Sequence, residues 1–246
     1  MTRNSGSSIN TASLDEIFNF WEIDSLVKDC CQIASQNPQR LYLFMQRYAF
    51  FNSFAGSLVA RLASSIGLSH NVFVDPSCPD LEEADRRMDI AANIFAATVD
   101  EHSDCHYKDT PHRTLAVATL KAIGDFASLS EEQKNKLSQT PQYLTPILEK
   151  TIQGYQGVPG NAWELVKSMG FHAASEILAS HEYTVIDEII RYENQGQGFD
   201  GYLSNGNRQV TVNGQNINPW SWIVIHGNYK GSGVEEGRFV SSEIAA

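Results

Sequence analysis

The stretch at residues 161–191, NAWELVKSMGFHAASEILASHEYTVIDEIIR, decides the fold. Apolar residues recur through it at steps of three and four, and no proline interrupts it, which predicts one long helix. On a helical projection Glu176 falls on the same apolar side as Leu165 and Tyr183. A carboxylate in such surroundings costs several kcal/mol unless a cation or hydrogen-bond donors meet it. The rest of the chain must therefore supply a partner for Glu176.

The composition limits the classes of protein to consider. At 246 residues and 42% hydrophobic, the chain can bury a sizeable core as one domain. Its net charge of −11 argues against nucleic acid and against an anionic membrane surface as partners, because both select basic patches. The sequence has no apolar run of ~18 residues that predicts a membrane span. The start, MTRNSGSSINTAS, lacks the apolar centre of a signal peptide, so we expect a cytoplasmic protein.

The rest of the chain has the pattern of further helices in one domain. Residues 1–12 are small and polar and are expected to be a disordered tail, and 13–246 to form a single helical-bundle domain. After Glu193 the composition changes to loop with one small hairpin near 208–212, and Pro219 opens a last apolar helix. We expect an all-α bundle of about seven helices with almost no strand. The helical patterns cover residues 13–37, 39–67, 80–103, 112–127, 130–139, 140–157 and 220–229.

Three other polar residues share with Glu176 a position on an apolar helix face. His112 and His226 each align with apolar residues of their own helices. Glu101 aligns with apolar residues too, whereas its neighbour Asp100 aligns with polar ones and is expected to point outward. Two carboxylates and two imidazoles, each pointing inward from a different helix, are a typical metal-ligand set for the core of a bundle.

Each of these residues also has an ordinary structural explanation. A single inward histidine is more often a hydrogen-bonded core residue than a ligand. Glu176 alone would be satisfied by an arginine such as Arg61, and Glu101 lies near the end of its helix. One shared metal site explains all four residues more simply than four unrelated structural roles, so the set favours a metal site.

The remaining histidines rank lower as ligands. His172 lies one turn from Glu176 and is a candidate additional ligand or a partner of one. His181 lies about 140° around the helix from Glu176, which predicts a surface position or a contact behind a ligand. His70, His102 and His106 are expected to face solvent.

Four phrases of the sequence resemble a known family. They are NIFAATVDEH (93–102), PHRTLAVATLKAIG (111–124), GFHAASEILASHEYTVIDE (170–188) and INPWSWIVIH (217–226). Together they resemble the haem-oxygenase-like di-iron oxidases and oxygenases, and most closely a cyanobacterial CADD-like group of unknown function. The resemblance covers most of the chain from about residue 40 onward.

The resemblance implies a seven-helix bundle in which inward Glu and His side chains hold two irons. By position, Glu101 matches the first glutamate of the family, His112 the histidine that opens the next helix, Glu176 the bridging glutamate and His226 the first histidine of the last core helix. These are the residues that the helix faces had already selected.

The sequence departs from the family pattern after His226. The family continues as His-x-x-x-Asp-x-x-His and so supplies ligands to the second iron, but Lys230 and Gly233 stand at those positions here. Glu235 and Glu236 are the nearest carboxylates, and a lysine ammonium would repel a cation. One iron site is therefore complete in the resemblance and the second is not. A single-metal site, another metal such as Mn(II), and a metal-free site all stay open.

These patterns predict a non-haem metal oxidase or oxygenase that acts on a small organic substrate with dioxygen. Mixed Glu and His ligands suit one or two ions of iron, with manganese as the alternative. The aromatic residues Tyr48, Phe50, Phe51 and Phe54 are expected to wall an apolar substrate pocket. Enzymes of the resembling family cleave carbon–carbon bonds of fatty or amino acids, oxygenate amines, or make para-aminobenzoate from their own side chains. A homodimer is the expected assembly.

Two other classes of function remain open. The first is a metal-free bundle that binds a small ligand or a partner, which fits the missing Asp and His of the second site. The second is a thiaminase-like hydrolase, which needs a cysteine nucleophile beside a carboxylate or base. Cys105 is the candidate nucleophile. The other cysteines, Cys30, Cys31 and Cys78, have no metal-ligand spacing and are expected to be reduced thiols.

Overall fold

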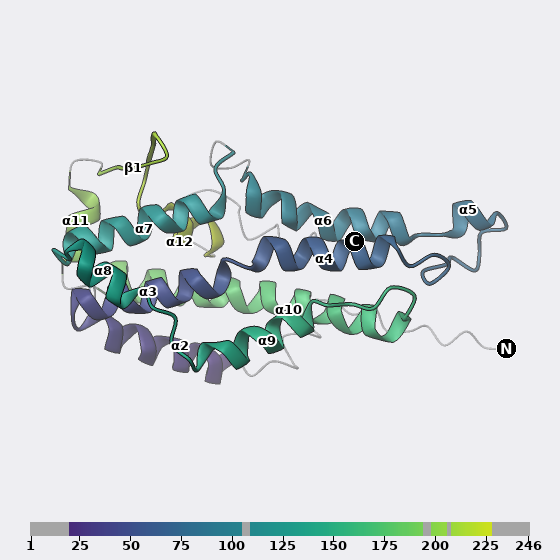
Figure 1. Cartoon of the computed structure of the whole chain (residues 1–246), viewed down its shortest axis with the longest axis horizontal. Coiled ribbons are helices and arrows are strands. Elements are labelled where there is room, and N and C mark those ends of the chain that lie inside the picture. The colour runs from purple at the N-terminus through teal and green to yellow at the C-terminus, as the bar shows by residue number, and fades with distance from the viewer. Residues whose placement is uncertain (1–19, 105–108, 194–197, 206–207, 228–246) are drawn as a thin grey trace.

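The computed structural model describes residues 20–104, 109–193, 198–205 and 208–227 (Figure 1). This part of the chain is mostly helical, which confirms the all-α prediction. The expected tail, residues 1–12, lies outside the described residues. The helices are α2 (Phe20–Ser35), α3 (Pro38–Asn52), α4 (Ala55–Gly67), α5 (Leu81–Ala84), α6 (Arg87–His102), α7 (His112–Phe126), α8 (Glu131–Leu137), α9 (Leu144–Gly154), α10 (Ala162–Asp187), η2 (Glu188–Tyr192), α11 (Phe199–Ser204) and α12 (Ser221–His226), and the strands are β1 (Val210–Val212) and β2 (Gln215–Ile217).

Helix α10 is the predicted long helix and runs along most of the long axis of the molecule (Figure 1). The Asn161 side chain accepts a hydrogen bond from the Glu164 amide and so caps its start. At the other end the helix widens into the π-helical turn η2. There the buried Asp187 accepts hydrogen bonds from Arg191 and, at 2.6 Å, from the Trp220 indole. This contact fixes the residue that precedes α12 against the end of α10.

The second expected helix is divided into α3 and α4, which corrects the prediction of one continuous helix at 39–67. Side chains at the break bond to backbone carbonyls: Asn52 Nδ2 donates to the Tyr48 carbonyl at 3.0 Å, and Ser53 Oγ donates to the Phe50 carbonyl at 2.7 Å. Such bonds compete with the helical hydrogen bonds of the backbone.

The third expected helix is divided in a similar way. Asp80 caps the single turn α5 through the amides of Glu82 and Glu83. Asp85 is then extended, forms a bridge with Val74, and accepts a hydrogen bond from the Arg87 amide at 3.2 Å. The long helix α6 therefore begins only at Arg87.

A small hairpin is present as β1 and β2, paired antiparallel, but it spans 210–217 rather than the predicted 208–212. Its two-residue turn is Asn213-Gly214, and both residues have positive φ, at 51° and 79°. Asn-Gly is the preferred pair for this hairpin turn because Asn and Gly tolerate that conformation. The hairpin lies against α7, where Lys121 Nζ donates to the Thr211 carbonyl at 2.8 Å.

Two apolar clusters form the interior. One joins α2, α3, α7, the second half of α10, the hairpin and α12. The other joins α4 and α6 with Tyr155 and with Leu165 of the first half of α10. Among the described residues, no helix combines the length and the apolar character needed to cross a membrane.

Candidate metal centre

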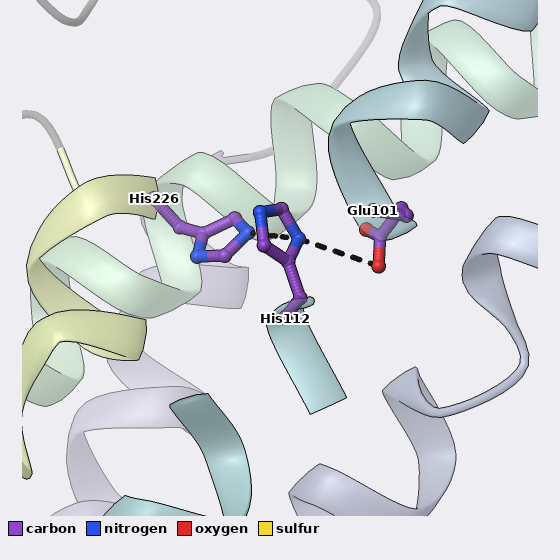
Figure 2. Close-up of side chains that lie close together, drawn as sticks. All are labelled: Glu101, His112 and His226. Carbon is purple, nitrogen blue, oxygen red and sulfur yellow. Dashed lines mark hydrogen bonds and ion pairs between the residues drawn. The ribbon is translucent and has the colours of Figure 1, made fainter. Parts of the chain in front are cut away.

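Three of the four predicted ligands lie close together, and each comes from the end of a different helix (Figure 2). Glu101 is in the last turn of α6, His112 is the first residue of α7, and His226 is the last residue of α12. The start of α7 lies beside the end of α6, across the link that joins the two helices. Its ends are joined by a backbone bridge between Asp104 and Thr110.

The three side chains meet at Nδ1 of His112. Glu101 Oε2 lies 3.3 Å from this atom, and His226 Nε2 lies 3.2 Å from it. All three ligand atoms lie within 4.8 Å of one another. Two atoms bound at right angles to a metal at about 2.1 Å lie about 3 Å apart, so the spacing suits one coordination sphere.

The outer partners of the two imidazoles set which nitrogen carries hydrogen. His226 Nδ1 lies 2.6 Å from the Trp222 carbonyl oxygen, which can only accept, so Nδ1 is the donor. His112 Nε2 donates to Asp104 Oδ2 at 3.1 Å. Asp104 is 3% exposed. A buried carboxylate behind a ligating histidine is the usual support of a metal site.

These tautomers direct three electron pairs at one point. In the neutral imidazoles, the lone pairs of His112 Nδ1 and His226 Nε2 face each other and the carboxylate of Glu101. That arrangement is repulsive unless a cation lies between the three groups. A metal ion supplies the cation, and so does a proton that converts His112 to an imidazolium.

The pKa values describe the metal-free form of this cluster. Burial lowers the pKa of His112, but hydrogen bonds to Asp104 and Glu101 outweigh it and raise the pKa to about 10. Burial raises the pKa of Glu101, and the bond to His112 brings it below its ordinary value. Burial, followed by the charge on His112, lowers the pKa of His226 to about 4. Without metal, the proton is therefore held by His112.

The fourth predicted ligand, Glu176, does not belong to this three-residue group. Its Oε1 lies 3.5 Å from Nδ1 of His172, one turn earlier on α10. Burial lowers the pKa of His172 to about 4, so this contact joins a carboxylate to a neutral imidazole. Glu176 nevertheless faces the same cavity as the other three residues.

This cavity has a volume of about 430 Å³, within the range of pockets that hold a small organic molecule. All four predicted ligands contribute to its lining, as does Arg113. Aromatic and aliphatic side chains supply much of the remaining wall, namely Phe50, Val117, Leu120, Tyr155, Tyr183 and Trp222.

The aromatic residues of the second expected helix contribute less to this wall than predicted. Phe50 lines the cavity, but Tyr48, Phe51 and Phe54 do not. Tyr48 instead packs against Tyr183, with ring centroids 5.3 Å apart, and its hydroxyl donates to Glu182 at 2.9 Å.

The other predicted histidines lie outside the three-residue group. His181 contacts Asp24 at 3.3 Å, on the side of α10 away from the ligands. His70 lies 3.6 Å from Asp85, and His102 Nδ1 bonds to the Thr98 carbonyl at 2.8 Å. The other residues named in the predictions lie outside the described residues, namely Cys105, His106, Lys230, Gly233, Glu235 and Glu236.

The sequence reasoning missed Asp104 and Tyr183 as parts of the site. Asp104 lies in the link between α6 and α7, where no helical projection gives a direction to a side chain. The sequence around it does not single it out, because Asp104 is one of two aspartates in the link and lies six positions before Thr110. Tyr183 was assigned to the core, and its ring does stack on His226, with centroids 4.4 Å apart.

Comparisons of this chain with protein-family models, with curated proteins and with solved structures gave no match.

Proposed function

We propose that this protein is a non-haem oxidase or oxygenase in which Glu101, His112 and His226 hold a single Fe(II) ion. The observation that carries the proposal is the meeting of two imidazole nitrogens and one carboxylate oxygen, with tautomers that leave the free electron pairs pointing together. Two histidines and one carboxylate are the ligand set of many Fe(II) oxygenases.

The ligand set and the cavity support this chemistry together. Fe(II) with three protein ligands supplies open coordination positions and the electrons for reducing dioxygen. The cavity beside the ligands accommodates a small organic substrate. Zinc also binds two histidines and a glutamate, and manganese suits the same donors, so the choice of metal needs a direct measurement.

Residues around the three ligands orient the imidazoles and bury them from solvent. Asp104 and the Trp222 carbonyl hold the two imidazoles in the ligating tautomers. The Tyr183 ring stacks on His226, with ring centroids 4.4 Å apart, and the Trp222 ring packs edge-on against Tyr183. Glu176 faces the cavity and is placed to contact a substrate or a second cation.

A haem-oxygenase-like fold of the CADD-like type fits this proposal. Its support is the mostly helical structure and the position of all four resembling residues, Glu101, His112, Glu176 and His226, around one cavity. We propose one metal ion per chain rather than two, because Glu176 lies apart from the three-residue group.

Metal analysis tests the proposal directly. The protein is loaded with Fe(II) without oxygen, desalted and analysed for bound iron. We expect about one iron per chain in the wild type and in Glu176→Ala, and little iron in His226→Ala or Glu101→Ala. His181→Ala serves as the matched control, because His181 lies on the same helix as Glu176 but contacts Asp24 instead.

Oxygen uptake then distinguishes an iron site from a zinc site. The iron-loaded protein should consume dioxygen in the presence of a reductant, and the zinc-loaded protein should not. Iron that stays bound in His226→Ala would contradict the three-residue site. Two irons per chain, with one lost in Glu176→Ala, would replace the single-ion centre with a di-iron one.

A metal-free binding protein is the second candidate function. It is favoured by His112, which two carboxylates hold as an imidazolium without any metal. In that case the cavity binds a small ligand beside a buried imidazolium that is paired with Glu101 and Asp104. Wild-type protein that binds neither Fe(II) nor Co(II), with its fold intact by circular dichroism, would support this candidate. The hydrolase alternative depends on Cys105, which lies outside the described residues.

A further inference from the structure

Helix α12 carries His226 but is only six residues long. Isolated helices shorter than about 12 residues are marginal in water, so the position of α12 depends on contacts with the rest of the molecule. At its end, His226 Nε2 lies 3.2 Å from His112 Nδ1. Side chains that share a binding site must be held within about 0.5 Å of the working geometry. The contacts that hold the start of α12 therefore bear on the site at its end.

The indole of Trp220 holds the start of α12. This residue directly precedes the helix and is 2% exposed, and its Nε1 donates to Asp187 Oδ1 at 2.6 Å. Its ring also packs edge-on against Phe199, with centroids 5.5 Å apart. Apolar packing is not directional, whereas a short hydrogen bond to a charged oxygen fixes both a distance and a direction. The indole bond therefore defines where α12 begins relative to α10.

Asp187 is itself held in place from its own helix. It is 5% exposed, and Arg191 donates to both of its carboxylate oxygens, with Nη2 2.6 Å from Oδ2. The backbone leaves the α-helical pattern directly after Asp187, because the Glu193 amide donates to the Glu188 carbonyl, five residues earlier, at 2.8 Å. Such π-helical turns are rare and frequently lie at functional sites.

An ion pair buried in this way adds little net stability. Removing both charges from water costs free energy that their attraction only about offsets, so apolar residues of similar volume often stabilise a fold equally well. The neighbours of Asp187 on this part of the helix, Ile186, Ile189 and Ile190, do belong to the apolar cluster. An apolar side chain at position 187 could not accept the indole hydrogen. The charge on Asp187 is therefore better explained by direction than by stability.

We propose that Asp187 and Trp220 are positioning residues that hold the His226 imidazole in its place beside His112. Neither of them lines the cavity, so both act through α12. Asp187 fixes the Trp220 indole, Trp220 fixes the start of the helix, and the Trp222 carbonyl lies 2.6 Å from His226 Nδ1 at its end. The inference deepens the proposed function, and it rests on that function only for its effect on metal binding.

Nuclear magnetic resonance of metal-free protein with ¹⁵N-labelled histidine tests the positioning directly. The chemical shifts of the ring nitrogens report their hydrogen bonds, and His226→Gln identifies the His226 signals by their loss. We expect Trp220→Phe and Asp187→Ala each to move these signals. The double variant should move them no further than Asp187→Ala does, because both changes remove the same bond. The signals of His181, which contacts Asp24, should stay in place.

Ile190→Val is the matched control for a loss of stability alone. Ile190 is fully buried in the same apolar cluster, so the smaller side chain lowers the urea midpoint but leaves the indole bond intact. We expect its His226 signals to match the wild type. Circular dichroism checks that each variant is folded. Wild-type His226 signals in folded Trp220→Phe, or equal movement in Ile190→Val, would overturn the positioning role.

Titration with Co(II) measures the consequence for the metal. Trp220→Phe should bind Co(II) about 10-fold more weakly, the lower end of the loss that follows changes behind a ligand. The intensity of its visible Co(II) bands should change as well, whereas Ile190→Val should keep the wild-type bands. Wild-type protein that binds no Co(II) would refute the proposed metal centre, and the histidine spectra would still decide the positioning role. Wild-type affinity and bands in Trp220→Phe would overturn its bearing on the metal.

Discussion

Asp104 determines which nitrogen His112 offers to the cavity. Its carboxylate accepts the Nε2 hydrogen at 3.1 Å from a buried position, so Nδ1 is left as the candidate ligand atom. Asp100 also lies near Nε2, at 3.8 Å, but half of its side chain is in solvent. The two aspartates therefore differ in burial and in distance while facing the same atom.

Asp104→Asn should weaken metal binding by about 10–100-fold, the usual cost of losing a carboxylate behind a ligating histidine. The amide oxygen can still accept the Nε2 hydrogen, but its lack of charge lowers the basicity of the ring. Titration with Co(II), followed by its visible absorption, gives the dissociation constant. Asp100→Asn is the matched control and should bind Co(II) as the wild type does. Equal affinities for all three proteins would contradict the role of Asp104.

The residues of the candidate site were only partly predictable from sequence. Helical projection identifies Glu101, His112 and His226 because each shares a face with apolar neighbours, and that geometry is local. It gives no distance between helices, so it does not separate Glu176 from the other three. It also gives no direction to Asp104, whose position depends on how the link folds back.

His172 should make the protein sensitive to acid. Burial lowers its pKa from 6.5 to about 4, so the folded state favours the neutral ring. Below pH 6.5 the ring takes up a proton in the unfolded chain but not in the folded chain. The free energy of unfolding therefore falls between pH 6.5 and pH 4, by up to about 3 kcal/mol. His172→Phe should remove this contribution to the pH dependence. Urea unfolding at several pH values measures the free energy of unfolding of both proteins. His70→Ala, at a half-exposed histidine, is the control. If the free energy of unfolding of His172→Phe fell with pH as steeply as that of the wild type, His172 would not be the cause.

At the scale of elements, the approach of α4 to α6 depends on Gly56. A Cβ at this position would lie 2.5 Å from His102 Cε1 and 3.1 Å from Glu101 Cβ. The first contact is relieved if the His102 ring turns away from the Thr98 carbonyl to which it bonds. The second contact displaces the backbone end of a candidate ligand.

Gly56→Ala should therefore destabilise the fold by about 1–2 kcal/mol and weaken metal binding, although no ligand is changed. Thermal unfolding and Co(II) titration measure the two effects. Gly170→Ala is the matched control: it is also a helical glycine, and a Cβ there would meet nothing within 4 Å. That change should stabilise the protein by about 0.5–1 kcal/mol. A Gly56→Ala protein as stable as Gly170→Ala would show that the helices have room to separate.

Helices were predicted correctly where apolar residues recur at helical spacing. The breaks between helices were missed where side chains form hydrogen bonds with the backbone. Apolar periodicity correctly identified α7 and α10. The hairpin was expected near 208–212 and lies at 210–217, because the prediction did not use the turn at Asn213-Gly214. The breaks after Asn52 and at Asp85 were missed, because the residues around them are compatible with a helix. Side-chain hydrogen bonds occupy these positions: Asn52 and Ser53 donate to backbone carbonyls, and Asp85 accepts from the Arg87 amide. Such bonds compete with the helical bonds of the backbone, and apolar periodicity does not reveal them.

At the scale of the molecule, the candidate metal centre joins the two apolar clusters. Glu101 belongs to α6, in the cluster built with α4, and the two histidines belong to helices of the other cluster. Helix α10 passes through both clusters and carries Glu176 between them. The overall class was predictable because each helix shows its own period. The arrangement was not, because it depends on contacts such as that of His112 with His226, 114 positions apart.

A bound ion at this centre would close a loop of more than a hundred residues and tie the short α12 to the rest of the molecule. Closing a long loop removes freedom from the unfolded chain, and binding only the folded chain stabilises it further. Proteolysis near α12 would then be slower when the metal is bound. The lifetime of the protein in the cell would follow the supply of that metal, without any separate sensor.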